Sequence, residues 1–308
     1  MIKFYKSFEN KISEIHSAVS GCWVSVTDPT PQEIKELIDD YGLDSGFVKS
    51  SLDDEETSRI EREDNQTLII VDSPVSEVDD ERTLLFYTIP IGIIITENYV
   101  FTISVKESRI IDEATGGVIK NLSTNLKTRF VLQLLLRIIT LFLIYLKQID
   151  KISSRAEQEL HDAMKNKLIM QLLELEKSLV YFSTSLKANE VTIEKIYRGR
   201  VIKLYDDDQD LLEDVLIEIK QAIDMSNIYS SILSTMMEAF SSVISNNLNF
   251  VMWRLTVITV IMAIPTMVYS FYGMNTSGLP MPVTWFPTLL SVVLTLIVAF
   301  LLLKMKKK

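Results

Sequence analysis

The chain has 308 residues, of which 47% are hydrophobic and 23% charged, and its mean hydropathy is +0.20. This combination suggests a soluble part joined to a membrane part. Residues 251–308 carry Arg254, four lysines and no acid, which gives a charge of +5. Since the formal net charge of the whole chain is −10, residues 1–250 carry −15. An acidic body argues against nucleic-acid binding, which needs a clustered cationic face, and favours multivalent cations as partners.

The single cysteine and the N-terminal residues exclude further classes. Cys22 is the only cysteine, which excludes a disulfide framework within one chain and a CxxC zinc site. We interpret it as a small buried apolar residue. The opening sixteen residues hold no apolar run of signal-peptide length, so we expect the N-terminus to stay in the cytoplasm.

Residues 1–120 alternate between strand-like and helix-like patterns. The run GCWVSVT over residues 21–27 predicts a strand, and the following Asp-Pro-Thr-Pro predicts a helix over residues 31–42. The pattern also predicts a second helix over 52–63 and strands over 66–71, 83–96 and 99–105. We therefore expect a compact α/β domain with a mixed sheet. No glycine-rich phosphate loop is present, so nucleotide binding has no support in the sequence.

Residues 121–205 have the composition of long helices. The run 130–146 is apolar enough to resemble a membrane span, but it has only 17 residues and contains Gln133 and Arg137. A central arginine costs about 2.5–3.5 kcal/mol in membrane insertion. We therefore expect a buried helix of the soluble domain. Residues 147–163 and 165–198 then predict an antiparallel helical pair.

From Asp206 to Tyr272 the helical pattern continues without a breaker except Pro265. Such a helix would be roughly 100 Å long at about 1.5 Å per residue, which exceeds what one globular core needs. We predict a stalk over 206–250 that continues into the first of two membrane spans. The transmembrane domain is then 251–308, with spans at about 251–272 and 283–303.

The charges at the two spans predict their orientation. Arg254 lies at the start of the first span, and the second ends at Lys304 and three further lysines. Lysine and arginine excess marks the cytoplasmic side, so we expect both termini inside and a short external loop over 275–284. Two spans cannot enclose a pore. Transport would therefore require a homo-oligomer with one helix of each subunit along the axis.

The first span ends in Tyr272-Gly273-Met274-Asn275, and a short outer loop and a terminal lysine cluster follow. With WVSVTDPT ahead of the first helix, these features resemble the CorA family of divalent-metal channels over the whole chain. The resemblance implies a funnel-shaped homopentamer in a cell (inner) membrane, passing Mg²⁺ and sometimes Co²⁺ and Ni²⁺. It also implies that Gly273, Met274 and Asn275 form a selectivity filter.

The resemblance extends to inner positions of the pore and to a regulatory site. NFVMWRLT is similar to the family's inner pore, which implies that Asn249 forms a polar ring and that Met252 and Leu255 form an apolar gate. Asp214 matches the family's regulatory metal position between subunits. Its partner would be an acid of a neighbouring copy, and the sequence leaves three candidates open: Glu77, Asp79 and Asp80.

The expected function is therefore potential-driven influx of hydrated Mg²⁺, closed by intracellular Mg²⁺. The expected partners are other copies of the chain, the bilayer and divalent ions; no cofactor and no enzymatic activity are expected, because no nucleophile–base arrangement emerges. Two alternatives stay open. One is a Zn²⁺ transporter of the same superfamily, whose members often carry Gly-Ile-Asn. The other is a non-conducting, membrane-tethered oligomeric sensor or scaffold.

Overall fold

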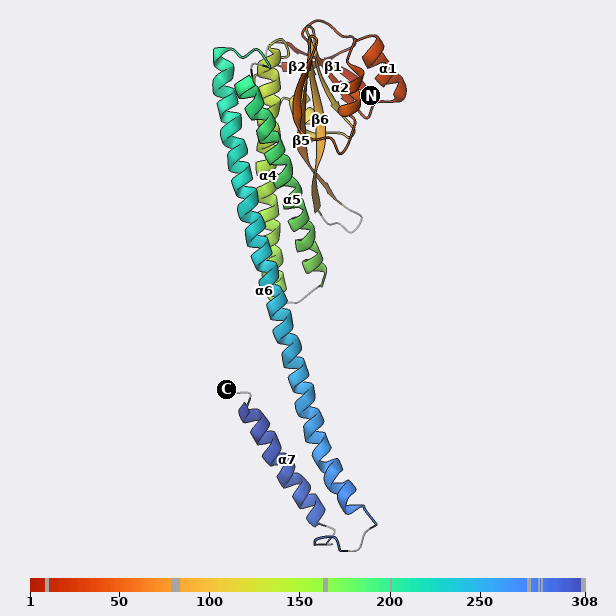
Figure 1. The fold of residues 1–308 in the computed structure, drawn as a ribbon, viewed down its shortest axis with the longest axis vertical. Helices are drawn as coiled ribbons and strands as arrows, with labels where there is room; N and C mark the ends of the chain where they lie inside the picture. The colour runs from red at the N-terminus through yellow and green to blue at the C-terminus, as the bar shows by residue number, and fades with distance from the viewer. Residues whose placement is uncertain are drawn as a thin grey trace. The chain divides into compact units, whose positions relative to one another are not determined.

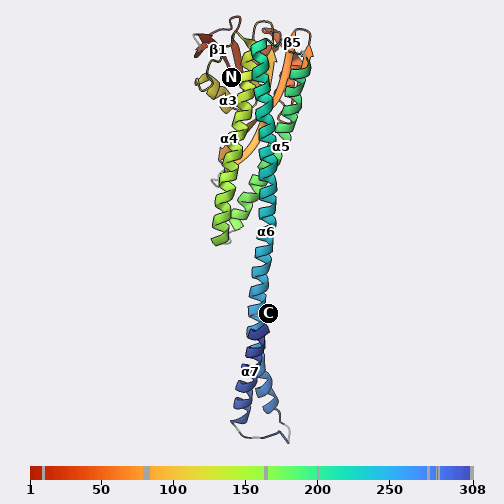
Figure 2. The same ribbon diagram turned by 90° about the vertical axis from the view of Figure 1, so that its left-hand side faces the viewer.

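The computed structural model describes residues 1–8, 11–78, 84–162, 166–199, 201–275, 278–281, 283 and 285–305. The chain forms two compact units, Met1–Met236 and Met237–Lys308. Helix α6 (Asp206–Tyr272), drawn in cyan and blue in Figures 1 and 2, contributes residues to both units. This helix has the bounds predicted from the sequence.

The first unit is built on a seven-stranded sheet with the order β2-β1-β3-β7-β6-β5-β4. Its strands are β1 (Ile2–Phe8), β2 (Lys11–Ile15), β3 (Trp23–Thr27), β4 (Arg59–Glu63), β5 (Gln66–Val78), β6 (Leu84–Ile95) and β7 (Val100–Ser104). Strands β3 and β7 pair in parallel, with Trp23 opposite Val100, and the other described pairs are antiparallel. The predicted mixed sheet is confirmed.

Two short helices, α1 (Pro31–Asp39) and α2 (Ser45–Ser50), cover one face of this sheet (Figure 1). Helix α1 begins in a capping box: the Glu33 backbone N–H donates to Thr30 Oγ1 at 3.3 Å, and the Thr30 N–H donates to Glu33 Oε2 at 2.8 Å. Leu37 and Phe47 bring the two helices onto a core that contains Cys22 at 1% exposure. The interpretation of Cys22 as a buried apolar residue is confirmed.

The helix predicted over 52–63 is wrong. Turns follow α2, and residues 59–63 form β4, whose Arg59 lies opposite Ile70 of β5. Glutamate and arginine favour helices in isolation, but the open backbone edge of β5 offers hydrogen bonds that outweigh this preference. The hairpin of β1 and β2 was not predicted at all, although its segment alternates between apolar and polar residues.

Helices α3 (Arg109–Thr115), α4 (Lys127–Asp162) and α5 (Asn166–Gly199) complete this unit with the start of α6. Figures 1 and 2 show α4 and α5 side by side against the sheet, on the face opposite α1 and α2. The first part of α6 packs on these helices through Leu212, Val215 and Ile219, each 0% exposed. The Ser226 hydroxyl donates to the Leu179 carbonyl at 3.3 Å.

Helix α4 is buried in the soluble unit, as predicted. It passes a length and hydropathy test for a membrane span, but 67% of its most apolar stretch is buried within this unit. Arg137 Nε lies 2.6 Å from Glu113 Oε2 of α3, and Arg109 Nε lies 2.8 Å from Glu113 Oε1. Burial would raise the pKa of Glu113, but the hydrogen bonds from Arg137 and Arg109 outweigh it and the pKa is lowered. The arginine that disfavours membrane insertion therefore has a specific partner.

The second unit contains the rest of α6 and helix α7 (Phe286–Met305). Only 6% of the most apolar stretch of α6 is buried, in contrast to α4, and the apolar part of α7 runs from Phe286 to Leu302. Thr256 and Thr259 donate their hydroxyls to the carbonyls of Met252 and Leu255 in the preceding turn, at 2.9 and 2.8 Å. Hydroxyl groups that donate to carbonyls of their own helix can be placed in the hydrocarbon region of a bilayer.

Candidate functional site

The motif Gly273-Met274-Asn275 directly follows the last residue of α6. The Gly273 N–H donates to the Tyr269 carbonyl at 2.9 Å, and the Met274 N–H lies 3.4 Å from the Phe271 carbonyl. Neither Gly273 nor Asn275 has a positive φ. A left-handed helix cap, the usual structural reason for glycine or asparagine at a helix end, therefore does not account for these two residues.

Space around Gly273 gives a local reason for glycine. A Cβ atom added to Gly273 would lie 3.1 Å from the Tyr269 carbonyl oxygen and 3.7 Å from that of Ser270. The shorter distance is tighter than ordinary carbon–oxygen contact, so a side chain would push the end of the helix. Gly273 thus lets the chain leave α6 close to its last turn.

Tyr272 joins the end of α6 to the segment that returns to α7. Its hydroxyl donates to the Pro280 carbonyl at 3.2 Å, and its ring centroid lies 6.2 Å from that of Phe286. One turn earlier, the Tyr269 hydroxyl lies 3.4 Å from Thr288 Oγ1. These contacts fix both ends of the connection that carries Asn275. Tyrosine and tryptophan at helix ends are typical of a membrane–water interface, and Trp285 is 60% exposed here.

The motif side chains are open in a single chain. Met274 is 52% exposed, and Gly273 and Asn275 are also exposed. The connection beyond Asn275 contains no acid in the sequence TSGLPMPVTW. The ligands that Asn275 offers a cation are consequently neutral: its side-chain amide oxygen and backbone carbonyls.

The predicted pore residues lie along one helix and are likewise exposed in the chain. Met252 is 54% and Leu255 57% exposed, and Asn249 is also exposed. Near them, the Arg254 guanidinium lies 4.1 Å from the centre of the Phe250 ring. Exposed apolar residues on a helix with so little burial are typical of a membrane or protein interaction surface.

Of the predicted regulatory residues, the structure describes Asp214 and Glu77, and it does not bring these two together within one chain. Asp214 lies on the exposed side of α6, and the structure records no contact between Asp214 and Glu77. Glu77 instead accepts a hydrogen bond from the Tyr87 hydroxyl at 2.8 Å, and Lys106 Nζ lies 3.4 Å from the same hydroxyl. Burial and the bond to Glu77 raise the pKa of Tyr87. Asp79 and Asp80 lie outside the described residues.

Within the described residues, no group of three or more His, Cys, Asp or Glu side chains could hold a metal ion. Sequence reasoning missed the bond from Tyr272 to Pro280, because its two residues belong to different segments and no spacing rule connects them. The aromatic residues at both span ends are the one signal that pointed there.

The chain combines a compact α/β unit, a long helix that is apolar and exposed in its second half, and a second apolar helix after a short connection. These features are those of a membrane protein with a soluble domain. The sequence matches the family described as CorA-like Mg2+ transporter protein over residues 20–307. The chain belongs to this family, whose members are ion transporters and not enzymes.

Individual relatives agree with this assignment. The chain is 30% identical over 272 residues to the cobalt/magnesium transport protein CorA of Methanocaldococcus jannaschii, covering 84% of this chain and 81% of the relative. It is 20% identical over 298 residues to the protein of the same description from Thermotoga maritima, covering 93% and 82%. Its fold is similar to the complete structure of the CorA magnesium transporter from M. jannaschii, with a TM-score of 0.80, 22% identity and coverage of 100% and 98%.

Proposed function

We propose that this chain forms a homopentameric, funnel-shaped channel in a cell membrane that carries Mg²⁺, and also Co²⁺, inward. In this proposal Gly273, Met274 and Asn275 form a ring at the outer mouth, and both termini are cytoplasmic. The observation that carries it is the Gly-Met-Asn motif at the exposed end of α6, in a backbone conformation that helix capping does not explain. Relatives named for cobalt and magnesium transport support the choice of ion.

Neutral ligands suit a hydrated magnesium ion. Mg²⁺ gives up its water reluctantly, so a filter is best served by groups that hydrogen-bond to the ion's water shell. The amide oxygen of Asn275 and nearby carbonyls can accept such bonds without a fixed charge that would trap the ion. Since the connection beyond the motif has no acid, Asn275 carries more of the selectivity in this proposal.

The membrane potential supplies the driving force. An inside-negative potential contributes about 2.3 kcal/mol per charge per 100 mV, so a divalent ion gains roughly 4.6 kcal/mol. At equilibrium this free energy corresponds to an accumulation of the divalent ion inside the cell of about a thousandfold or more. No nucleotide hydrolysis is needed. The exposed Met252 and Leu255 would form the apolar constriction inside the filter, which closes by excluding water.

Uptake into proteoliposomes tests the proposal. The purified chain is reconstituted, an inside-negative potential is imposed, and influx of Mg²⁺, Co²⁺, Ni²⁺ and Zn²⁺ is measured separately and in competition. We expect Mg²⁺ influx that depends on the potential and falls at least about tenfold in Asn275→Ala. Met281→Ala, in the same connection and 63% exposed, is the matched control and should conduct normally. Full Mg²⁺ influx in Asn275→Ala would contradict the filter assignment.

The same experiment separates the two alternatives. Influx of Zn²⁺ that Mg²⁺ does not inhibit would favour a zinc transporter of this superfamily. The absence of influx for every ion would favour a membrane-tethered sensor or scaffold. Met274 supports the magnesium assignment, because the zinc members often have isoleucine at this position of the motif.

Regulation by intracellular Mg²⁺ is the second part of the proposal. Asp214 is exposed on α6 and could share an ion with an acid of a neighbouring copy, Glu77, Asp79 or Asp80. Ions that neutralise facing carboxylates would stabilise a symmetric closed state. We expect Asp214→Lys to weaken inhibition of influx by internal Mg²⁺. Glu213→Lys, which reverses a charge that is also exposed one residue away, should leave inhibition unchanged. Equal inhibition in both variants would remove Asp214 from the site.

A further inference from the structure

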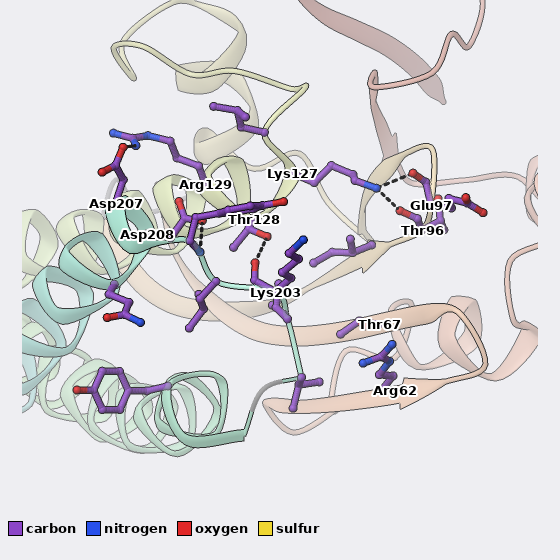
Figure 3. Close-up of a pocket in the computed structure, with 18 of the residues that line it drawn as sticks. Arg62, Thr67, Thr96, Glu97, Lys127, Thr128, Arg129, Lys203, Asp207 and Asp208 are labelled. Carbon is purple, nitrogen blue, oxygen red and sulfur yellow. Dashed lines mark hydrogen bonds and ion pairs between the residues drawn. The ribbon is translucent and has the colours of Figure 1, made fainter.

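A cavity of about 1160 Å³ in the first unit is not used by the proposed transport mechanism. Figure 3 shows its walls: the hairpin of β4 and β5, the end of β6, the first turn of α4, the last turn of α5 and the segment that leads into α6. Small-molecule sites in proteins commonly enclose about 300–1,000 Å³. The space is therefore large enough for a ligand of nucleotide size.

The cavity wall is cationic although the surrounding unit is acidic. It contains five basic side chains, Arg62, Lys127, Arg129, Arg198 and Lys203, and three acidic ones, Glu97, Asp207 and Asp208. Residues 1–250 as a whole carry −15. The charge of the cavity wall is therefore opposite in sign to the charge of the domain around it. The basic residues come from four separate segments, so no linear motif revealed them.

Three of the five cations, Arg62, Lys127 and Lys203, form no ion pair with an acid among the described residues, whereas Arg129 and Arg198 do. The structure places no carboxylate of the described residues within ion-pair distance of Arg62 or Lys203; the Lys203 ammonium lies 5.2 Å from the Tyr205 ring centre. Arg129 reaches Asp207 only at 3.9 Å, and Asp207 is 90% exposed. Buried Asp208 is already engaged, because it accepts a hydrogen bond from the Tyr205 N–H at 3.2 Å.

Lys127 is held in place by neutral groups. Its ammonium donates to the carbonyls of Thr96 and Glu97 at 2.8 and 2.6 Å, as Figure 3 shows. No charged partner therefore cancels its charge at close range. Burial lowers the pKa of Lys127 against the opposing charge of Glu97, which indicates an ammonium that is partly desolvated. An anion in the cavity would relieve that cost.

Backbone donors add to the positive wall. Helix α4 begins at Lys127, and its first-turn N–H groups have no acceptor within the helix. No acid lies in this turn, so the positive end of the helix dipole is uncompensated by its own side chains. The Thr128 hydroxyl donates to the Lys203 carbonyl at 2.9 Å and thereby fixes the segment that carries Lys203 against α4.

We propose that this cavity binds a phosphate-bearing anion, with the unpaired Arg62 and Lys203 and the first turn of α4 as the contacts to phosphate. Arginine forks and helix N-termini are the groups that proteins use for phosphate oxygens. Exposed Tyr197 and Tyr205 on the cavity wall could stack on the base of a nucleotide. Such a site differs from a glycine-rich phosphate loop, because side chains from separate segments supply the contacts.

Calorimetry on the full chain in detergent tests the site, with ATP, tripolyphosphate, inorganic phosphate and adenosine as probes. Metal-free buffer prevents chelation of Mg²⁺ from producing a false signal. We expect ATP or tripolyphosphate to bind, adenosine not to bind, and affinity to fall with salt. Tighter binding of ATP than of tripolyphosphate identifies a nucleotide as the ligand, and equal binding identifies a simple polyphosphate.

Charge reversal locates the binding. In the double variant Arg62→Glu with Lys203→Glu, each charge reversal should weaken binding by about thirtyfold. This value follows because a contact near 4 Å in water contributes about 1 kcal/mol and reversal turns that attraction into an equal repulsion. Lys187→Glu with Lys220→Glu changes the net charge equally at exposed positions outside the cavity and should bind as the unaltered chain does. Thermal unfolding checks that both pairs fold. No binding of any phosphate probe, or undiminished binding by the Arg62 and Lys203 variant, would overturn the proposal.

Discussion

The ion pair between Glu113 and Arg137 allows a sharp test of how the apolar helix α4 is held in the soluble unit. The Glu113 side chain is 10% exposed and that of Arg137 is 22% exposed, and the two meet at 2.6 Å. We predict that Glu113→Ala lowers the free energy of unfolding by about 3 kcal/mol. Removing one member of a buried pair costs roughly 3–5 kcal/mol, and partial exposure of Arg137 places this pair at the lower end.

The third member of the cluster should matter less. Arg109 is 48% exposed, and a pair of this kind contributes about 0.3–0.5 kcal/mol. We expect Arg109→Ala to cost no more than that, apart from its contact with the Tyr145 ring. The double variant Glu113→Leu with Arg137→Leu removes both charges together and should recover most of the loss, because an apolar pair of similar size needs no desolvation.

Fluorescence of Trp23 provides the assay. The chain has three tryptophans, and Trp253→Phe with Trp285→Phe leaves Trp23, which is 0% exposed and lies against Phe130 of α4 at 5.3 Å between ring centres. Urea unfolding of the detergent-solubilised chain then reports on the first unit. A loss below about 1 kcal/mol in Glu113→Ala, or a larger loss in the Leu–Leu variant, would refute the reasoning.

Other predictions concern a buried polar cluster and the motif. Burial raises the pKa of Asp72, although hydrogen bonds from Ser185 and Ser58 oppose the shift, so the ionised carboxylate destabilises the fold at pH values above its folded pKa. Asp72→Asn should therefore raise the melting temperature at pH 7, and this gain should vanish as the pH falls toward 4, where the carboxyl of the unaltered chain is protonated. Asn189 is 0% exposed and bonds to the Asp72 N–H and carbonyl at 2.9 and 2.8 Å; urea titration of Asn189→Ala should show a loss of about 2–3 kcal/mol. Gly273→Ala should reduce Mg²⁺ influx in proteoliposomes without changing the melting of the first unit, because its Cβ crowds only the local Tyr269 carbonyl.

The sequence predicted the elements whose signals are local or long. Helix α6 was found with its bounds because its acidic start and its unbroken pattern mark both ends. The buried position of α4 followed from a single arginine, and the structure supplies that arginine's partner. The segment over 52–63 failed because its helix-favouring residues are recruited by a neighbouring strand, which local propensity cannot reveal.

The candidate site divides in the same way. Gly273, Met274 and Asn275 are contiguous, so a motif could identify them, and the structure adds that their backbone is not a left-handed cap. The partner of Asp214 could not be chosen from the sequence, because the contact would join different copies of the chain. The cavity cations were missed for a related reason: they are far apart in the sequence, from Arg62 to Lys203, and come together only after the sheet and the helices have packed.

The parallel pairing of β3 with β7 has a consequence for how this protein is made. Because Trp23 lies opposite Val100, the first half of the sheet cannot close until the residues of β7 have been synthesised. At about 5–20 residues per second, the residues up to Met236 take roughly ten to fifty seconds, which is longer than the millisecond-to-second folding of most domains. The soluble unit is nevertheless complete only once the start of α6 has been made, because Leu212, Val215 and Ile219 belong to its core, so its last packing step comes shortly before the apolar residues of α6 are synthesised.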